Sequence, residues 1–499
     1  MASRIGRDVI TERSLQMKKG KALFPRGRAI KVGVASSILV VLLIVACRTA
    51  PAFDAFYPVY RAAMVYHDFD MALELIEYKQ AGDNPLYAAN NEISFLLDRG
   101  VLRHFSGRYV ESIQDLLEAE RLIQEAFTES VTAGLMTWLG NDSARDYAGE
   151  DFEDIYLSVF NALNFAQQGD LEGAMVEVRK LTMDPAGKLP QLAIRHENVR
   201  QSFASGLEGI LNRVGISLLD AMPAGDVLAA HVRDYGAFSD SALARYLSVL
   251  FLMANGDEDS ARIEYERLQE AFASNPRIFH HPVPASAVGM REVPAGYGRL
   301  NVLAFHGPSV TKEEIRFEGR FPFLTNSALQ TPTFRLPVMM SVTHVGGNVN
   351  RVQVVVDGHG AFDLDMIEDM ERVMFATFNQ RFIDMYFRTF MRVLYRYIAI
   401  DIAANLAYSQ TPGGALAQRA ARTAAIVAGR AASNALEGAD LRMSRFLPGA
   451  ARVGALDLEP GIHNVTVNYY IGARRYHSES HTVEVTAGGL NLLRTVKLR

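Results

Sequence analysis

The stretch Ala162–Val178, ALNFAQQGDLEGAMVEV, decides how the first half of this chain folds. Ala162 is followed seven positions later by Gly169, and five positions after that by Ala174. Small residues at facing positions let two helices approach closely, and glycine followed by aspartate favours a reversal of the chain between them. The stretch therefore predicts two helices joined by a tight turn.

The same spacing occurs at Gly100–Ser112 and at Val249–Ala261, and in a weaker form at Tyr60–Glu77. Its recurrence is typical of tetratricopeptide (TPR) repeats, in which pairs of helices stack on one another. The spacing between the copies is irregular, so a generic helical bundle is the alternative. We predict a TPR-like α-helical domain over residues 56–275, and such arrays form concave surfaces that bind partners.

The helical periodicity ends at Asn275, and prolines mark a linker over residues 276–298. Short alternating segments separated by Gly or Pro turns then predict an antiparallel β domain over residues 299–499. Its strands are expected at 299–305, 337–344, 351–356, 451–458, 463–470, 481–485 and 492–498. A helical hairpin at about 365–436 interrupts them, since two helical segments flank Thr411-Pro-Gly-Gly414. The predicted fold class is multidomain, α followed by α+β.

The single cysteine, Cys47, ends an apolar run, Val32–Ala46, that basic residues precede. This order is typical of a secretory signal peptide. Ile44-Val45-Ala46-Cys47 also resembles a bacterial lipobox, in which the thiol receives a diacylglycerol and the chain is cut before it. We expect a signal peptide over residues 1–46, with translation starting at Met1 or Met17, and a lipidated tether over 47–55. The alternative is an uncleaved membrane helix, but the run is shorter than the roughly 20 residues that a bilayer requires.

Charge and composition limit the partners. Residues 1–46 hold nine Lys/Arg and two Asp/Glu, which leaves 42 basic and 54 acidic residues after them and a formal net charge of −12. Nucleic acid is therefore not expected as a partner, since binding to phosphates needs a basic surface. No cysteine follows Cys47, so disulfides and thiolate zinc ligands are absent from the rest of the chain.

Two charged segments have alternative interpretations. The acidic residues between Asp142 and Asp154 could form a calcium loop, but their spacing does not match an EF-hand. They fit better as caps of the following helix, because acidic side chains favour a helix N-terminus. Arg388, Arg392 and Arg396 lie four residues apart and would form one helical stripe that meets lipid phosphates or an acidic partner. A solvated face with local partners such as Asp384 is the simpler reading.

The search for catalytic chemistry finds no nucleophile-elbow, metalloprotease, dinucleotide or P-loop motif. Asp357, His359 and Asp363 form the most enzyme-like cluster, although a strand-to-helix turn capped by Asp363 or Asp365 explains it more simply. His477 and His481 share strand parity and could bind a metal if an acidic ligand came from elsewhere. Exposed or core histidines are the simpler explanation. We predict no catalytic or metal site, and no cofactor beyond an acyl lipid on Cys47.

Several motifs together resemble an uncharacterised family of TPR-bearing bacterial cell-envelope lipoproteins. They lie at Asn141–Glu153, Ala162–Phe165, Gly169–Lys180, Gly298–Arg316, Ala439–Pro448 and Leu458–Gly461. The resemblance spans most of residues 56–499 and implies an envelope location, with small lipoproteins of the curli-secretion or penicillin-binding-protein-activator type as gene neighbours. It implies no activity. Ser444 stands where the family pattern leads us to expect a tryptophan.

The expected function is a lipid-anchored periplasmic scaffold, with the outer membrane favoured because Arg48 rather than aspartate follows Cys47. Eight residues are candidates for partner binding: Tyr109, Trp138, Tyr147, Asn164, Arg179, Arg388, Arg392 and Arg396. The partners would be envelope proteins, including other small lipoproteins. Two other functions stay open: an envelope hydrolase that uses Asp357, His359 and Asp363, and a carrier of lipid or another small ligand in the β domain.

Overall fold

The computed structural model describes residues 53–132, 145–182, 188, 191–192, 235–288, 293–319 and 331–499. All of them belong to one compact unit, Ala50–Arg499. The predicted signal peptide, Cys47 and Trp138 lie outside the described residues. Within the described part, none of the helices combines the length and the apolar character that crossing a membrane requires.

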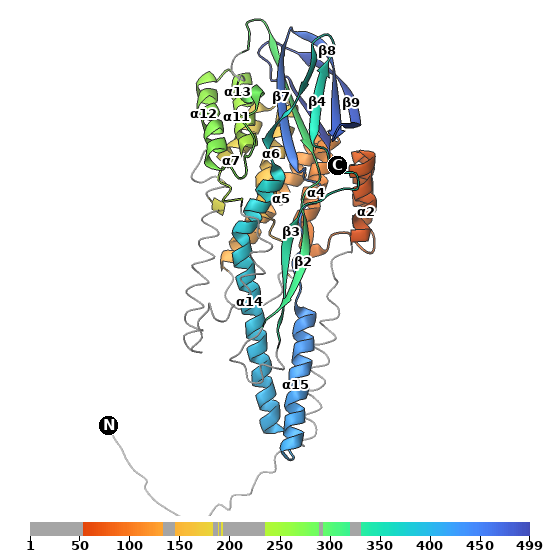
Figure 1. Ribbon diagram of the computed structural model, residues 1–499, viewed down its shortest axis with the longest axis vertical. Coiled ribbons are helices and arrows are strands. Elements are labelled where there is room, and N and C mark those ends of the chain that lie inside the picture. Colours follow the sequence, from red (N-terminus) through yellow and green to blue (C-terminus); the bar gives the residue numbers. More distant parts are fainter. Residues whose placement is uncertain are drawn as a thin grey trace, which may run out of the picture. The chain divides into compact units, whose positions relative to one another are not determined.

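The first half of the described chain is helical, as the sequence predicts (Figure 1). Its first helix begins at Phe53, inside the stretch expected to be a tether. The elements are α2 (Phe53–Arg61), η1 (Ala62–Tyr66), α3 (Phe69–Gln80), η2 (Ala89–Asn91), α4 (Glu92–Phe105), α5 (Tyr109–Thr132), α6 (Asp151–Gln167), α7 (Leu171–Thr182), α11 (Ala242–Ala254), α12 (Glu258–Ser274) and α13 (Ala285–Val288).

Three helix pairs pack through short turns: α4 with α5, α6 with α7, and α11 with α12. The turn of each pair contains a glycine with a left-handed backbone, Gly107, Gly169 and Gly256, at φ of +76°, +77° and +75°. Glycine adopts this conformation without steric cost, whereas residues with a Cβ do not. Within α4, a Cβ on Gly100 would lie 2.8 Å from Cδ2 of Leu116 on α5. A small residue is therefore what lets α4 and α5 approach closely.

The described residues of the second half form three sheets, with strand orders β10-β1-β7-β6, β2-β3 and β5-β4-β8-β9. The strands are β1 (Gly298–His306), β2 (Thr311–Glu318), β3 (Thr333–Met340), β4 (Arg351–Val356), β5 (Gly360–Asp363), β6 (Asp365–Glu368), β7 (Ala450–Leu458), β8 (Gly461–Ile471), β9 (Arg474–Val485) and β10 (Leu492–Lys497). β1 pairs antiparallel with β7 but parallel with β10. The prediction of an antiparallel β domain is confirmed for the other described strand pairs and is wrong for β1 and β10. A pairing between the two ends of this half leaves no local signal in the sequence.

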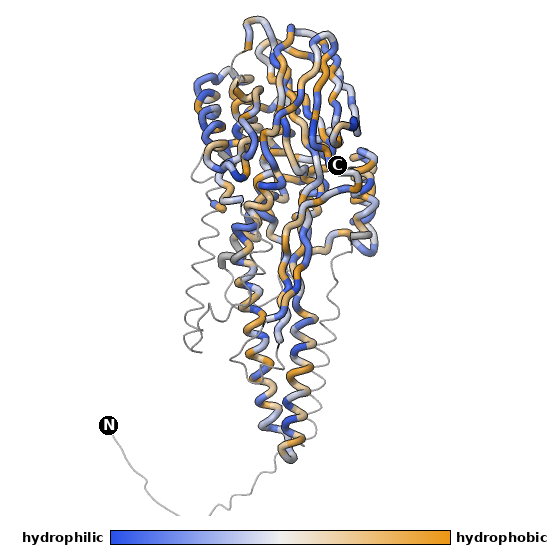
Figure 2. Tube along the Cα trace, viewed as in Figure 1, coloured by the Kyte–Doolittle hydropathy of each residue, from blue (hydrophilic) through white to orange (hydrophobic). Residues whose placement is uncertain are grey.

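The helical hairpin consists of α14 (Met370–Gln410) and α15 (Ala415–Leu436), which pack along each other (Figure 1). Polar and apolar residues are mixed along both helices (Figure 2). The hairpin begins later than predicted, because Asp365 pairs with Val453 in the ladder between β6 and β7. The cap of α14 is Asp369, whose carboxylate accepts a hydrogen bond from the Arg372 amide. The prediction that Asp363 or Asp365 caps this helix is wrong.

One hydrophobic core joins the helices to the sheet of β1 and β7. The rings of Phe160 on α6 and Phe305 on β1 lie 5.3 Å apart between centroids. Glu368, at the end of β6, accepts hydrogen bonds from Tyr156 on α6 and from Ser241 before α11. Apolar packing and buried hydrogen bonds thus link the two halves around the site described next.

Candidate functional site

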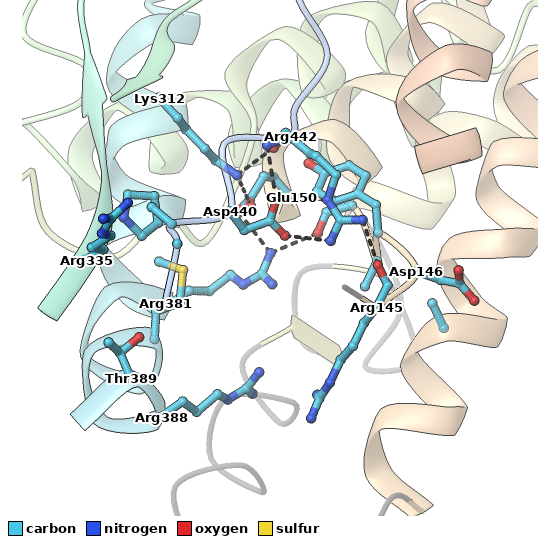
Figure 3. Close-up of a pocket in the computed structure, with 18 of the residues that line it drawn as sticks. Arg145, Asp146, Glu150, Lys312, Arg335, Arg381, Arg388, Thr389, Asp440 and Arg442 are labelled. Carbon is cyan, nitrogen blue, oxygen red and sulfur yellow. Dashed lines mark hydrogen bonds and ion pairs between the residues drawn. The ribbon is translucent and has the colours of Figure 1, made fainter. Parts of the chain in front are cut away.

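A cavity of about 440 Å³ lies where the segment before α6 meets β2, β3, α14 and the segment after α15 (Figure 3). We call it the arginine pocket. It is lined by Ala126, Arg145, Asp146, Tyr147, Ala148, Gly149, Glu150, Lys312, Arg335, Pro337, Arg381, Met385, Arg388, Thr389, Arg392, Gly438, Ala439, Asp440 and Arg442. Its volume is within the range of pockets that bind small molecules or side chains of a partner.

The lining of the arginine pocket contains seven basic side chains and three acidic ones. This balance is opposite to that of the chain after residue 46, whose formal net charge is −12. Clefts that concentrate one sign of charge attract ligands of the other sign. The pocket is thus a local cationic site in an acidic protein.

Glu150 is the central acidic residue of the pocket and caps α6. Its carboxylate and that of Glu153 form a capping box at the start of the helix, which confirms that the acidic segment acts as a helix cap. Lys312 from β2 pairs with Oε1 of Glu150, and Arg381 from α14 donates to its Oε2 at 3.0 Å. Two cations from the second half therefore neutralise one carboxylate of the first half.

Arg442 closes another side of the pocket. Its guanidinium pairs with Asp440 at 2.8 Å and donates to the main-chain oxygens of Asn90 and Arg145, at 2.8 and 2.7 Å. Burial alone would raise the pKa of Asp440, but the hydrogen bonds and charge of Arg442, with the charge of Lys312, hold it below its ordinary value. Asp440 is thus an anion at neutral pH, and the loop after α15 is anchored to the helical half.

Tyr147 forms an aromatic wall beside these cations. The Arg442 guanidinium lies 5.2 Å from the ring centroid, and the Lys312 ammonium lies 5.8 Å from it. The Tyr147 hydroxyl donates to Glu153 at 2.8 Å, and burial together with that carboxylate raises the pKa of Tyr147 well above its ordinary value. Burial, followed by the charge of Glu150, also raises the pKa of Glu153 to about 7.

Arg145 can receive a ligand. Figure 3 shows the side chains of Arg145, Arg381 and Arg388 extending into the same open space. Nη2 of Arg145 is buried and has no hydrogen-bond acceptor among the described residues. A buried donor without an acceptor is costly, and guanidinium groups bind carboxylates and phosphates through paired hydrogen bonds. The pocket is therefore suited to an anionic group.

Three of the predicted partner-binding residues meet in this pocket: Tyr147, Arg388 and Arg392. The solvated-face reading of the arginine stripe is wrong for Arg392, which is 1% exposed and pairs with Glu437 at 2.7 Å. Arg396 pairs with the same carboxylate at 2.6 Å. The loop after α15 folds back onto α14, and the sequence does not reveal this contact.

The other predicted residues lie elsewhere. Tyr109 begins α5 and accepts a hydrogen bond from Arg494 at 2.7 Å. Asn164 is buried between His104 and Ser112, with hydrogen bonds of 2.7 and 2.8 Å. Arg179 is exposed on α7. Tyr109 thus links the helical half to the β-rich half, and Asn164 links neighbouring helices. Trp138 and Cys47 are not among the described residues.

The cluster considered for hydrolysis is spread over an exposed turn. Asp363 pairs with Arg351 at 3.0 Å, and the His359 ring lies 5.5 Å from that of His463. Among the described residues, no hydrogen bond or ion pair joins Asp357, His359 and Asp363 to one another. Their side chains do not form the connected set that acid–base catalysis uses.

Sequence reasoning missed four important residues of the pocket: Arg145, Lys312, Arg381 and Arg442. Lys312 carried a usable signal, because it is the last lysine before Lys497. Ser444, the departure from the family pattern, is fully buried and donates to Asp98 at 2.7 Å. A polar contact therefore occupies the place where we expected an aromatic one.

Comparison of the chain with models of protein families, with curated proteins and with solved structures gives no match. The function of the arginine pocket is therefore argued from its own geometry and charge.

Proposed function

We propose that this chain is a lipid-anchored adaptor of the bacterial cell envelope, facing the periplasm, that binds an acidic segment of a partner protein in the arginine pocket. The observation that supports the proposal is the cationic lining of the pocket in an otherwise acidic chain. The anchor is the acyl lipid expected on Cys47, and the outer membrane is the favoured location. No catalytic step is part of the proposal.

The three helix pairs are consistent with a TPR-like array. Each pair turns at a left-handed glycine, and α7 also packs against α11 of the next described pair. Arrays of this kind bind peptide segments of partner proteins along one face. The arginine pocket lies at an end of α6, so a segment bound along these helices could insert a carboxylate into it.

A carboxylate is the favoured ligand group, because the basic side chains of the pocket already form ion pairs with carboxylates. Lys312 and Arg381 already hold the carboxylate of Glu150, and Arg442 holds that of Asp440. The same geometry can be repeated by Arg145 with an incoming acidic side chain. Inorganic phosphate is the control ligand that separates an acidic segment from a phosphate-bearing one.

Site-specific photo-crosslinking in intact cells tests the adaptor. A photoreactive residue in place of Ala439, at the pocket, should yield a protein adduct, whereas the same residue in place of the exposed Arg474 should not. Adding Arg145→Glu should abolish the adduct, and adding Arg474→Glu, an equal change of charge outside the pocket, should leave it. Adducts that contain only lipid would favour the carrier, and adducts unaffected by Arg145→Glu would contradict the pocket as the binding site.

The anchor is tested separately. Mass spectrometry of the mature protein should find an acylated Cys47 at its N-terminus, and Cys47→Ser should move the chain from the membrane to the soluble fraction. A native polypeptide that still begins before Cys47 would overturn the anchor but not the pocket.

A further inference from the structure

We propose that His67, His477 and Glu479 form a binding site for a divalent transition-metal ion, with Zn²⁺ as the ion best suited to these ligands. One ligand atom from each of the three side chains lies within 4.8 Å of the other two. The site is independent of the arginine pocket and of the adaptor proposed above. It goes beyond the sequence prediction, in which His477 lacked an acidic partner.

His67 comes from the helical half. It ends the short helix η1 in a left-handed conformation, with φ of 57° and ψ of 35°. Residues with a Cβ adopt this conformation at a cost, and such strain is concentrated at functional sites. Asp68 stabilises the turn, because its amide donates to the Ala62 oxygen at 3.0 Å and its side chain caps α3. The position of the His67 ring is therefore defined by the backbone.

The other two ligands come from β9. His477, Glu479 and His481 alternate along the strand, so their side chains lie on one face of the sheet. Oε2 of Glu479 lies 4.0 Å from Nε2 of His67 and 3.6 Å from Nε2 of His481. The rings of His67 and His477 are 4.7 Å apart between centroids. Glu479 is thus the acidic ligand that the histidines need, and His481 is positioned to orient it.

The ring nitrogens are available for coordination. Nε2 of both His477 and His481 is buried without a hydrogen-bond partner among the described residues, and Nε2 of His67, at 4.0 Å from Glu479, is too far from that carboxylate for a hydrogen bond. Zinc binds imidazole nitrogen at about 2.0–2.1 Å and carboxylate oxygen at about 2.0–2.2 Å, so neighbouring ligand atoms in a tetrahedral site are roughly 3.4 Å apart. Shifts of about 1 Å, within the reach of side-chain rotation, convert the observed spacing into this geometry.

Two nitrogen ligands and one carboxylate select the class of metal. Imidazole suits zinc, copper, nickel and iron, whereas magnesium and calcium prefer sites made of oxygen alone. Side-chain exposures of 20% for both His67 and Glu479 leave a path for the ion. The nearby Lys497, whose ammonium donates to the Met64 oxygen at 3.3 Å, opposes a cation and limits the affinity. Three protein ligands leave a fourth position for water or for His481.

A metal at this site would join the start of the helical half to the sheet of β8 and β9. Because the ion would bind only when η1 and β9 lie together, it would stabilise the folded protein in proportion to its concentration. The metal would act as a clip between segments that lie more than four hundred residues apart in the sequence.

Calorimetric titration of the untagged, chelator-treated full-length protein with Zn²⁺ tests the site. We expect one ion per chain and a rise in melting temperature on Zn²⁺ addition, with no response to Mg²⁺. His67→Asn, which suits the left-handed backbone, and Glu479→Gln, which keeps the shape, should each weaken binding at least tenfold. The triple variant with His477→Ala should abolish both responses.

The matched control is His359→Ala, since His359 also lies beside another histidine but belongs to no group of three potential metal ligands among the described residues. This variant should bind Zn²⁺ as the parent protein does. Circular dichroism of each variant without metal establishes that it is folded. Absence of Zn²⁺ binding by the folded parent, or binding that the folded triple variant retains, would overturn the proposal.

Discussion

The ammonium of Lys312 and the carboxylate of Glu150 form an ion pair in which the two side chains are only 2% and 5% exposed. Glu150 caps a helix of the first half, and Lys312 extends from β2 of the second. The Lys312 ammonium also donates to the Arg442 oxygen at 2.8 Å. One lysine therefore fixes three segments around the arginine pocket, so its charge should matter for stability as well as for binding.

Replacing Lys312 with methionine should lower the free energy of unfolding by about 3 kcal/mol, because a buried carboxylate loses one of its cations. Arg381 still faces Glu150, which keeps the loss from being larger. Urea unfolding measures the change. The control is Arg262→Met, which breaks an exposed pair with Glu266 and should cost less than about 1 kcal/mol. Equal losses in the two variants would contradict the structural role of Lys312.

Glu368 should make a contribution to stability that falls as pH rises from about 4.5 to 7, opposite in sign to that of buried histidines such as His104 and His306, whose pKa values burial lowers. Burial raises the pKa of Glu368 to about 7, from 4.5 in the unfolded chain. The folded state therefore holds a proton that the unfolded state releases, and this contribution is complete below the lower pKa and lost above the higher one. The loss is about 3 kcal/mol at most.

Glu368→Gln should remove this falling contribution, because the amide does not titrate. Its oxygen can still accept hydrogen bonds from Ser241 and the Leu243 amide. Glu153, whose pKa burial also raises to about 7, contributes in the same direction, so the double variant with Glu153→Gln should lose both falling contributions. Chemical denaturation at several pH values measures both, and a slope unchanged in the double variant would refute the assignment.

Gly100→Ala should destabilise the contact between α4 and α5. The added Cβ would lie 2.8 Å from Cδ2 of Leu116 and 3.3 Å from Cβ of Asp115. Forcing atoms into a packed interface costs about 1–3 kcal/mol. Gly82→Ala is the control, since its nearest atoms are at an ordinary 3.6 Å, and it should change stability by less than about 1 kcal/mol. Thermal unfolding of both variants decides whether close approach is the reason for glycine at position 100.

Glu437→Ala should loosen the base of the hairpin. Glu437 holds Arg392 and Arg396, and both Arg392 and Glu437 are only 1% exposed at their side chains. Removing the carboxylate takes the paired anion away from a buried guanidinium group and should cost about 3 kcal/mol. Hydrogen exchange in α14 and α15 should rise accordingly. Replacing the exposed Glu459 with alanine should leave exchange in these helices unchanged, and a similar rise there would exclude a specific role for Glu437.

Local patterns predicted some elements but not β2, β5 or β6, and β3 lies at Thr333–Met340 rather than over residues 337–344. The strand predicted over residues 351–356 has these bounds in β4, and the three turn glycines lie between paired helices. The predicted start of the hairpin failed at Asp365, because pairing with β7 competes there with helix formation. The parallel pairing of β1 with β10 was also missed. Alternation and turn residues report on neighbours along the chain, and strand partners are chosen by burial across the whole fold.

The pocket was predicted only in part. Tyr147, Arg388 and Arg392 were named as candidates from sequence. Nothing local indicated that Arg145 and Arg442 would join them, and Lys312 was marked only by the absence of other lysines around it. Likewise, the pattern of β9 placed His477 and His481 on one face, whereas His67 reaches them only because η1 packs near that strand. Residues of one site that come from distant segments carry no shared spacing.

By itself, the sequence determined the helical first half, the β-rich second half, the helical hairpin between its strands and the excess of acidic residues. These properties follow from periodicity, turn residues and composition, which act over a few residues or over the whole chain. Only the tertiary structure decided that basic side chains gather around Glu150 and that His67 meets Glu479. A buried charge without a partner is costly, so buried charges in the folded protein lie beside opposite charges. Which opposite charges are near is decided by how distant elements pack.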